Sequence, residues 1–260
     1  MNRVVVFACA LLFSMSLSAQ SYPDWFLYPA KYPTIIAGFS YNRTDPAVDA
    51  ERMYCVYQEC VVNGTFEVYN NETNDLFLIN SDYYYYFSDS TLQAIQGNLY
   101  CHDSFITSVA RRDIVGAFST DKTLELERKF LRIESLPTPE WTEKRYWTEG
   151  DYAYGVGFYT ARGAKNDAWK TAEEQAYFQI LTNTAVKMYS MRIAEKASDG
   201  GTFETASVMK LKFSLRNIEV MERWHSLEKE MFYVLVRIRH SNIKSPYVKP
   251  TYKKVSRTER

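Results

Sequence analysis

Apolar positions with helical spacing occur in two stretches of the chain, one in each half. In the first stretch, Asp45 and Pro46 stand where an N-cap and a first helical residue are expected. The apolar positions that follow are Ala47, Ala50, Tyr54, Tyr57 and Val61. In the second stretch Asp167 is the corresponding cap. The apolar positions after it are Ala168, Ala172, Ala176 and Ile180. The spacing predicts two amphipathic helices, and the alanine row allows the second helix axis to come close to a sheet.

Segments typical of strands follow each predicted helix. Residues 217–224 and 231–240 are rich in branched and aromatic side chains, and the polar stretch 225–230 between them predicts a hairpin connection. Residues 208–215 alternate apolar and polar positions, which predicts either the start of that sheet or a further strand. In the first half, strand-like residues lie within 75–118, without clear boundaries between strands.

The order of elements is the same in both halves. Each half opens with Pro-acidic-Trp, at residues 23–25 and 139–141, and continues with an apolar strand ending in Gly-Phe, a polar turn with an arginine, and the helix. The matched pairs are Gly38 with Gly157, Phe39 with Phe158, Arg43 with Arg162, Asp45 with Asp167, Ala50 with Ala172, and Glu51 with Glu173. We therefore predict an α+β fold of two tandem strand-helix-strand-strand units, residues 20–135 and 136–243, each an antiparallel sheet packed by one helix.

The Pro-x-Trp opener, the tyrosine-rich strand closing on Gly-x-Gly-Phe, the alanine-spaced helix and the final "FYVLVRI" strand resemble the Lpp-twenty lipoproteins of bacterial cell envelopes. The same features resemble the amino-terminal domain of flagellar assembly protein T. The resemblance is best over residues 139–240 and fainter over residues 23–110. It implies a dodecin-like fold, a place in the periplasm or at the outer membrane, and no established catalytic residues. A motility role does not transfer with the fold alone.

Residues 1–19 have the pattern of a secretory signal peptide. Arg3 precedes an apolar run from Val4 to Phe13, and small residues continue to Ala19. The run is short for a membrane span, and no cysteine stands where a lipid would be attached. We therefore expect cleavage after Ala19 and export to the periplasm or outer membrane, with secretion and an uncleaved anchor as the alternatives.

Charge and cysteine content narrow the picture further. Lysine plus arginine equal aspartate plus glutamate at 31 each, so no whole-chain field favours a nucleic-acid partner. The mature chain keeps Cys55, Cys60 and Cys101. Cys55 and Cys60 are poor partners for each other on one helix, so the alternatives are three buried thiols or one bridge from Cys101 to either of them.

Two motifs invite an enzymatic interpretation. Gly155-Val156-Gly157 carries Thr160 where a dinucleotide fingerprint needs its third glycine, which favours strand glycines that permit a close backbone approach. His102-Asp103-Ser104 are adjacent, and neighbouring residues on a strand point to opposite faces, so they cannot form a hydrolytic triad. No histidine or cysteine spacing matches a metal site. We therefore expect no catalytic residue, no cofactor and no metal.

Aromatic and basic residues are the candidates for binding instead. A strand would send two of the four tyrosines at 83–86 to each face, so one pair is either buried against the second unit or exposed to a partner. These residues are Tyr83, Tyr84, Tyr85 and Tyr86. Trp25 and Trp141 are expected to line a cleft between the units. Residues 244–260 predict a disordered basic tail that stays solvated or touches anionic lipid or cell-wall polymers. Its candidate contacts are Lys249, Lys253, Lys254 and Arg257.

The residues together favour an exported, non-enzymatic cell-envelope protein that acts as an interaction or assembly module. Its expected partner is an envelope protein or a glycan, with self-association and peripheral membrane contact through the tail as further options. The alternative is a periplasmic protein that binds a small ligand or glycan in an aromatic cleft between the two units.

Overall fold

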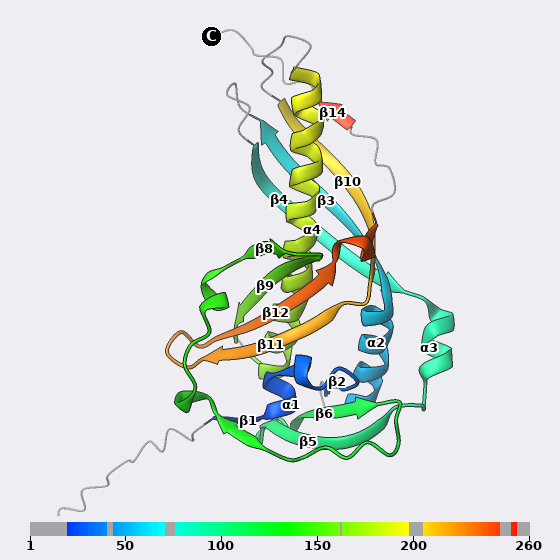
Figure 1. Cartoon of the computed structure of the whole chain (residues 1–260), viewed down its shortest axis with the longest axis vertical. Helices are drawn as coiled ribbons and strands as arrows, with labels where there is room; N and C mark the ends of the chain where they lie inside the picture. Colours follow the sequence, from blue (N-terminus) through cyan, green and yellow to red (C-terminus); the bar gives the residue numbers. More distant parts are fainter. Residues whose placement is uncertain are drawn as a thin grey trace, which may run out of the picture.

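The computed structural model has a mixed α and β fold with four α-helices and several antiparallel sheets in the part of the chain that it describes (Figure 1). This agrees with the predicted fold class. The predicted signal peptide lies outside the described residues. Those residues are 20–40, 44–70, 76–161, 163–197, 205–244 and 251–253.

The first sheet belongs to the amino-terminal half and has the strand order β2-β6-β5. Its strands are β2 (Ile36–Phe39), β5 (Tyr100–Ser108) and β6 (Asp113–Ser119). Helix α2 (Pro46–Gln58) packs on β2 and β6. Asp45 caps this helix as predicted, because its carboxylate accepts a hydrogen bond of 2.9 Å from the backbone N–H of Ala47.

The second sheet belongs to the carboxy-terminal half and has the order β11-β12-β9-β8. Its strands are β8 (Tyr146–Glu149), β9 (Tyr152–Thr160), β11 (Glu219–Ser226) and β12 (Met231–Arg239). The hairpin predicted between residues 217 and 240 is confirmed, since β11 and β12 pair antiparallel. Helix α4 (Lys165–Ala197) packs on β9 and β12.

These two sheets share one connectivity. In each, the strand before the helix pairs antiparallel with the second strand of a later hairpin, β2 with β6 and β9 with β12. The first hairpin strand, β5 or β11, lies beyond it. The matching order places the helix and the hairpin of each half in corresponding positions.

A third sheet combines strands from both halves. Strand β3 (Glu59–Asn70) follows α2 directly and pairs along its whole length with β10 (Thr205–Arg216), which follows α4. The order is β13-β10-β3-β4, with β4 (Leu76–Phe87) at one edge and β13 (Ile243–Lys244) at the other. Residues 208–215 therefore form a further strand outside the β11-β12 sheet, which decides between the two alternatives left by the pattern.

Part of the predicted disordered tail is ordered. Residues 251–253 form β14 (Thr251–Lys253), which pairs antiparallel with the Ala206–Val208 part of β10. The prediction of disorder was wrong there, because the backbone groups along an edge of β10 give even a polar segment hydrogen-bond partners.

Short elements complete the fold. Strand β1 (Ser21–Pro23) pairs antiparallel with β7 (Phe130–Arg132). Helices α1 (Asp24–Leu27) and α3 (Asp89–Ile95) are short. Single 3₁₀ turns are η1 (Pro29–Lys31), η2 (Ile133–Ser135), η3 (Glu140–Glu143) and η4 (His240–Asn242).

The alanine row of α4 is buried as predicted. Ala168, Ala172, Ala176 and Ile180 are at most 1% exposed. The helix lies so close to β9 that a Cβ atom added at Gly155 or Gly157 would overlap the helix backbone at Ala176 or Ala172. The glycines of the Gly-x-Gly motif therefore permit close packing of helix on sheet, as the sequence favoured.

The buried face of α2 differs from the predicted stripe. Ala50 is fully buried, but the other buried side chains of the helix are Met53, Cys55 and Val56, and Tyr54 and Tyr57 are only half-buried. The helix also ends at Gln58, so the last predicted stripe residue lies in β3. The prediction was wrong because α2 packs on a narrow three-stranded sheet, which leaves the two tyrosines beside a cavity.

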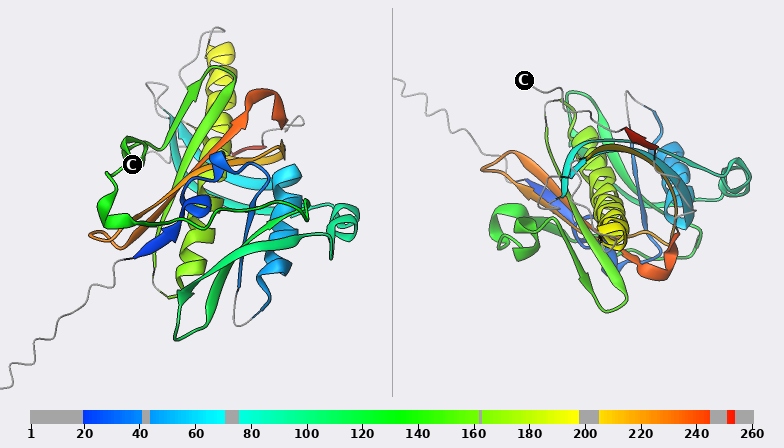
Figure 2. Two further views of the ribbon diagram at one scale, coloured as in Figure 1. Left: turned by 60° about the horizontal axis from the view of Figure 1, so that its bottom comes forward. Right: turned by 90° about the horizontal axis from the view of Figure 1, so that it is seen from above.

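One hydrophobic core runs through both halves. The ring of Trp169 on α4 packs edge-on against Tyr22 and Phe26 of the amino-terminal segment, with ring centroids 5.6 and 5.2 Å apart. Phe26 in turn packs against Phe105 on β5 at 5.1 Å. In the views of Figure 2, α4 runs along the molecule and the third sheet curves around it. Helix α4 is therefore shared by the two halves.

The three cysteines among the described residues form no disulfide with one another. Cys55 and Cys60 are buried free thiols, and Cys101 is an exposed free thiol. Burial raises the pKa of the Cys60 thiol to about 12. The alternative of one bridge is thus wrong, and the alternative of three buried thiols is wrong for Cys101.

Candidate binding site

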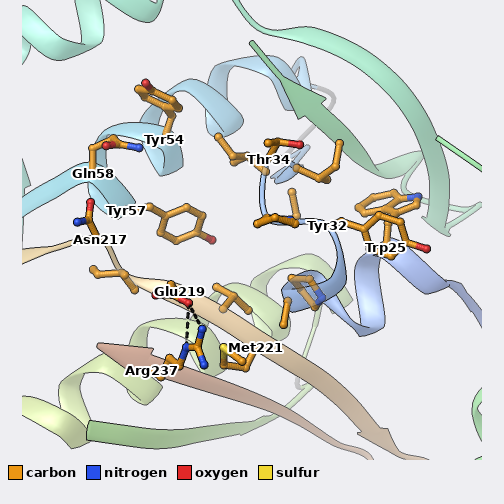
Figure 3. Close-up of a pocket in the computed structure, with 18 of the residues that line it drawn as sticks. Trp25, Tyr32, Thr34, Tyr54, Tyr57, Gln58, Asn217, Glu219, Met221 and Arg237 are labelled. Carbon is orange, nitrogen blue, oxygen red and sulfur yellow. Dashed lines mark hydrogen bonds and ion pairs between the residues drawn. The ribbon is translucent and has the colours of Figure 1, made fainter. Parts of the chain in front are cut away.

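A pocket of about 470 Å³ lies between the two halves of the chain (Figure 3). One wall is the segment 29–37, which connects α1 to β2. A second wall is the last turn of α2, and the third is formed by residues 217–223 at the start of β11. Pockets of this size at the junction of structural units commonly bind small ligands.

Side-chain contacts hold the first wall in place. The hydroxyl of Tyr32 donates a hydrogen bond of 2.8 Å to Asp24 Oδ2 on α1. Lys31 lies 3.7 Å from the other oxygen of the same carboxylate and also 4.1 Å from the ring centroid of Tyr28. Pro29 and Pro33 restrict the backbone of the segment further. This wall is therefore built before any ligand arrives.

A buried ion pair lies behind the second and third walls. Arg223 Nη2 on β11 is 2.7 Å from Glu173 Oε2 on α4, and both side chains are at most 2% exposed. Tyr57 on α2 donates its hydroxyl hydrogen to the other oxygen of Glu173. Burial and the negative charge of Glu173 raise the pKa of Tyr57 well above its ordinary value, so this hydroxyl stays protonated.

One donor of this network has no partner. Arg223 Nη1 donates to the carbonyl oxygen of Phe26 at 3.1 Å, but its buried Nε has no hydrogen-bond partner among the described residues. A buried donor without an acceptor costs free energy, about 1–3 kcal/mol. Arg223 is part of the pocket lining, but its Nε atom is itself buried, so this unpaired donor lies behind the pocket wall.

The third wall also carries a partly exposed ion pair. Arg237 donates from Nε and Nη2 to the same oxygen, Glu219 Oε2, at 2.8 and 2.6 Å. Glu219 Oε1 accepts no hydrogen bond from another described residue. The exposed amides of Gln58 and Asn217 lie on the same side of the pocket (Figure 3). The pocket thus offers both donors and acceptors.

The two candidate tryptophans occupy corresponding places, and one of them reaches the pocket. Trp25 is 1% exposed, is part of the pocket lining, and donates from its indole nitrogen to Asp103 Oδ2 on β5 at 2.9 Å. Trp141 lies away from the pocket lining and donates to Glu222 Oε2 on β11 at 2.9 Å. The expected cleft between the units therefore includes Trp25 and excludes Trp141.

The four consecutive tyrosines lie on β4 and alternate as the sequence predicted. Tyr83 stacks on Phe178 of α4 with ring centroids 4.6 Å apart, and Tyr85 donates a hydrogen bond of 2.7 Å to Glu174 on the same helix. Tyr84 and Tyr86 point to the other face and are 65% and 43% exposed. One pair is therefore packing and the other is available to a partner.

The remaining candidates give no common site. Lys249, Lys254 and Arg257 lie outside the described residues, and Lys253 lies in β14, where its backbone is opposite Ala206. The side chains of the motif at residues 102–104 do not bind one another. His102 is 3.0 Å from Ser119, and Asp103 binds Trp25 and Arg128.

The sequence interpretation missed most of the pocket. Tyr54 and Tyr57 were assigned to the core face of a helix, and Glu219 and Arg237 had no assigned role. Their positions within strands and a helix were predictable, but nothing local in the sequence brings these elements to one cavity. The signal that came nearest was the expectation of an aromatic cleft between the units.

In the described part of the chain, no three His, Cys, Asp or Glu side chains are grouped so that they could hold a metal ion. None of the described helices is long and apolar enough to cross a membrane. No protein-family model, no curated protein sequence and no solved structure matches this chain.

Proposed function

We propose that this chain is an exported, non-enzymatic protein of the bacterial cell envelope that acts as an interaction or assembly module. Its place is the periplasm or the outer membrane, with secretion as the alternative. The observation that carries the proposal is the outer face of β4, where Tyr84 and Tyr86 are exposed next to each other in alternate positions of a strand.

Strand β4 has the features of a docking edge. It pairs with β3 on one side and is the last strand of the third sheet in the described part of the chain. The partner we propose is an extended segment of another envelope protein, which would pair with the free backbone groups of β4 and cover the two tyrosines. Tyrosine suits this role because it supplies a large amphipathic contact area. Lys212 on β10, whose Nζ is 5.8 Å from the Tyr86 ring centroid, adds a positive charge to this face.

The proposal also includes an internal duplication and a similarity to the Lpp-twenty family. We infer two tandem strand-helix-strand-strand units of dodecin-like arrangement, divided near residues 135 and 136, of the kind found in the Lpp-twenty and flagellar relatives. Two observations support the duplication: the strand orders β2-β6-β5 and β9-β12-β11 correspond, and each opening tryptophan bonds a carboxylate on the corresponding hairpin strand. The basic tail, with Lys249, Lys253, Lys254 and Arg257, is proposed as a secondary contact to anionic lipid.

The docking edge can be tested with a double variant, Tyr84→Ser with Tyr86→Ser. Both side chains face away from α4, so we expect an unchanged melting temperature and loss of the partner in pull-downs from envelope fractions. The matched control is Tyr100→Ser, which removes an exposed tyrosine from β5 instead and should keep the partner. Identical partners for the double variant and the wild type would rule out this surface. If the pull-down with the wild type recovers only further copies of this chain, the proposed envelope partner is wrong and the exposed edge of β4 serves self-association.

A second candidate is a protein that binds a small ligand or glycan, and the pocket between the halves is the specific observation in its favour. The pocket combines aromatic walls with unused hydrogen-bonding atoms, which is typical of ligand sites. A thermal-shift screen with glycans, cell-wall fragments and a general library of small molecules tests it, because a ligand that binds the folded state raises the melting temperature. A flat response to all of them would count against it.

A further inference from the structure

The pocket between the halves has a charge balance that limits what it can bind. Its lining includes two arginines, Arg223 and Arg237, and each is paired with a carboxylate, Glu173 at 2.7 Å and Glu219 at 2.6 Å. A phosphate or carboxylate ligand needs a cation that is not already neutralised. The pocket contains no such unpaired cation among its lining residues. An uncharged ligand is therefore favoured over an anion.

The hydrogen-bonding atoms left over in the pocket are of both kinds. Glu219 Oε1 is an acceptor without a hydrogen bond from another described residue. The amides of Gln58 and Asn217 each add donors and an acceptor. A ligand that satisfies all of them must carry several groups that both donate and accept, which is the property of hydroxyls.

The other walls of the pocket are apolar and aromatic. Trp25, Tyr32, Tyr54, Tyr57 and Met221 lie around the cavity (Figure 3). Ile35 is a further apolar residue of the lining. Such walls suit a ring with C–H groups on its faces. A compound with hydroxyls around its rim and C–H groups on its faces is a sugar in its cyclic form.

We infer that the pocket binds a neutral saccharide, held by Glu219 and the amides of Gln58 and Asn217 against the tyrosine walls. This inference rests on the second candidate function and names its ligand class. Oxygen atoms of the sugar accept from the amides of Gln58 and Asn217, and a hydroxyl donates to Glu219 Oε1. The aromatic walls cover the ring faces.

Three sugars with one ring and different charges test the inference by calorimetry on the mature chain at pH 7. N-acetylglucosamine is neutral, glucosamine is a cation, and glucuronate is an anion. We expect N-acetylglucosamine to bind at least about tenfold more tightly than either charged sugar, the size of effect produced by one lost hydrogen bond to a charged group. Equal or tighter binding of glucuronate would overturn the charge argument.

The variant Glu219→Gln makes the test specific to the pocket. It leaves Arg237 without its carboxylate, so the preference for the neutral sugar over glucuronate should fall by about tenfold. The control is Glu228→Gln, an exposed carboxylate in the turn between β11 and β12, which should leave the preference unchanged. A general loss of folding would lower the affinity for all sugars together, whereas a change in preference requires the charge at residue 219. The same preference in the wild type and in Glu219→Gln would overturn the site.

Indole, an apolar aromatic compound of similar size, is the further probe. Its binding shows whether the pocket binds ligands at all when no sugar binds. Binding of indole without any neutral sugar would overturn the saccharide assignment and leave the ligand-binding function in place. Absence of binding by sugars, by indole and by the general library would overturn both.

Discussion

Each half of the chain turns from a strand into a helix at a glycine, and the two helices then continue for very different lengths. At the first corner Gly38 faces α2, where an added Cβ would overlap the carbonyl oxygen of Pro46 and lie 2.8 Å from the Cβ of Ala50. At the second corner two glycines, Gly155 and Gly157, face successive turns of α4. Helix α2 has 13 residues and α4 has 33. The longer helix needs the second glycine because it stays in contact with its strand for a further turn.

The difference in length changes what each helix holds together. Helix α2 packs chiefly on its own sheet. Helix α4 begins against strands of the other half, where the amide of Asn166 donates to the carbonyl oxygens of Ser40 and Ile114 at 2.9 and 3.1 Å. Further along, α4 contacts two tyrosines of β4: Phe178 stacks on Tyr83, and Glu174 accepts a hydrogen bond from Tyr85. Two similar strand-to-helix corners thus lead into one local helix and one helix that joins both halves.

Alanine at the two corners should test this difference with the largest effect. Gly157→Ala places a methyl group inside the backbone of α4, and this helix cannot easily move away because Asn166 binds the other half on one side of the contact and Phe178 packs on Tyr83 on the other. We expect the free energy of unfolding to fall by about 4 kcal/mol or more, whereas Gly38→Ala should cost about 2 kcal/mol because the first turn of the shorter helix can shift. Urea denaturation of both variants measures the two losses.

Gly163→Ala is the matched control for the corner variants. Gly163 lies between β9 and α4. An added Cβ would have no atom within 4 Å, and the backbone of this glycine is not in the left-handed region. Its effect should be within about 0.5 kcal/mol of zero. Equal losses for Gly38→Ala and Gly157→Ala would contradict the idea that α4 is the more constrained helix.

The matched glutamates Glu51 and Glu173 provide a second test. Glu173 pairs with Arg223 where both are buried, so Glu173→Gln leaves a buried guanidinium without its counter-charge and should cost about 3 kcal/mol. Glu51 accepts a hydrogen bond of 2.7 Å from the backbone N–H of Gly97 near the surface. Glu51→Gln keeps an amide oxygen as the acceptor and should cost less than about 1 kcal/mol. Thermal unfolding resolves the two, and similar costs would contradict the assignment of α4 as the shared helix.

The local parts of this fold were predictable from the sequence. An exception is Asp167, which was predicted as a cap but lies within the first turn of α4, because that helix begins at Lys165. The capped start of α2 at Asp45, the buried alanine row, and the hairpin around residues 225–230 each depend on residues close together in the chain. Their signals are spacing and turn composition, which act over one or two turns or a single loop.

The joint sheet and the pocket were not predictable because they depend on pairing between distant strands. β3 and β10 meet only when both halves are folded, and their alternating patterns fit several partners equally well. The Glu219–Arg237 pair depends on an irregularity in register between Val220 and Glu222. Without that irregularity Glu219 would stand opposite a different residue of β12, and no residue type in the stretch signals its position.

The smallest effects are expected at the two indole–carboxylate bonds, and they should have opposite signs. Asp103 also binds Arg128 Nε at 3.2 Å, so Asp103→Asn loses an ion pair and should cost about 0.5–1 kcal/mol. Glu222 has no ion pair among the described residues, and burial raises its pKa above the ordinary value of a glutamate, although the hydrogen bond from Trp141 opposes this. Glu222→Gln keeps an oxygen for the indole and removes a poorly hydrated charge, so it should stabilise the fold by about 0.5 kcal/mol at pH 7.

The stability difference between the wild type and Glu222→Gln should depend on pH. A carboxyl group whose pKa is raised by folding contributes its full stability below the unfolded pKa and loses that contribution as the pH rises through the folded pKa. The wild type should therefore match Glu222→Gln near pH 4 and become the less stable of the two as the pH approaches 7. Unfolding free energies of both proteins across this range measure the difference. The same difference in unfolding free energy between the wild type and Glu222→Gln at every pH would contradict this expectation. It would mean that folding does not disfavour the ionised form of Glu222, so that its charge is tolerated as well as the charge of Asp103.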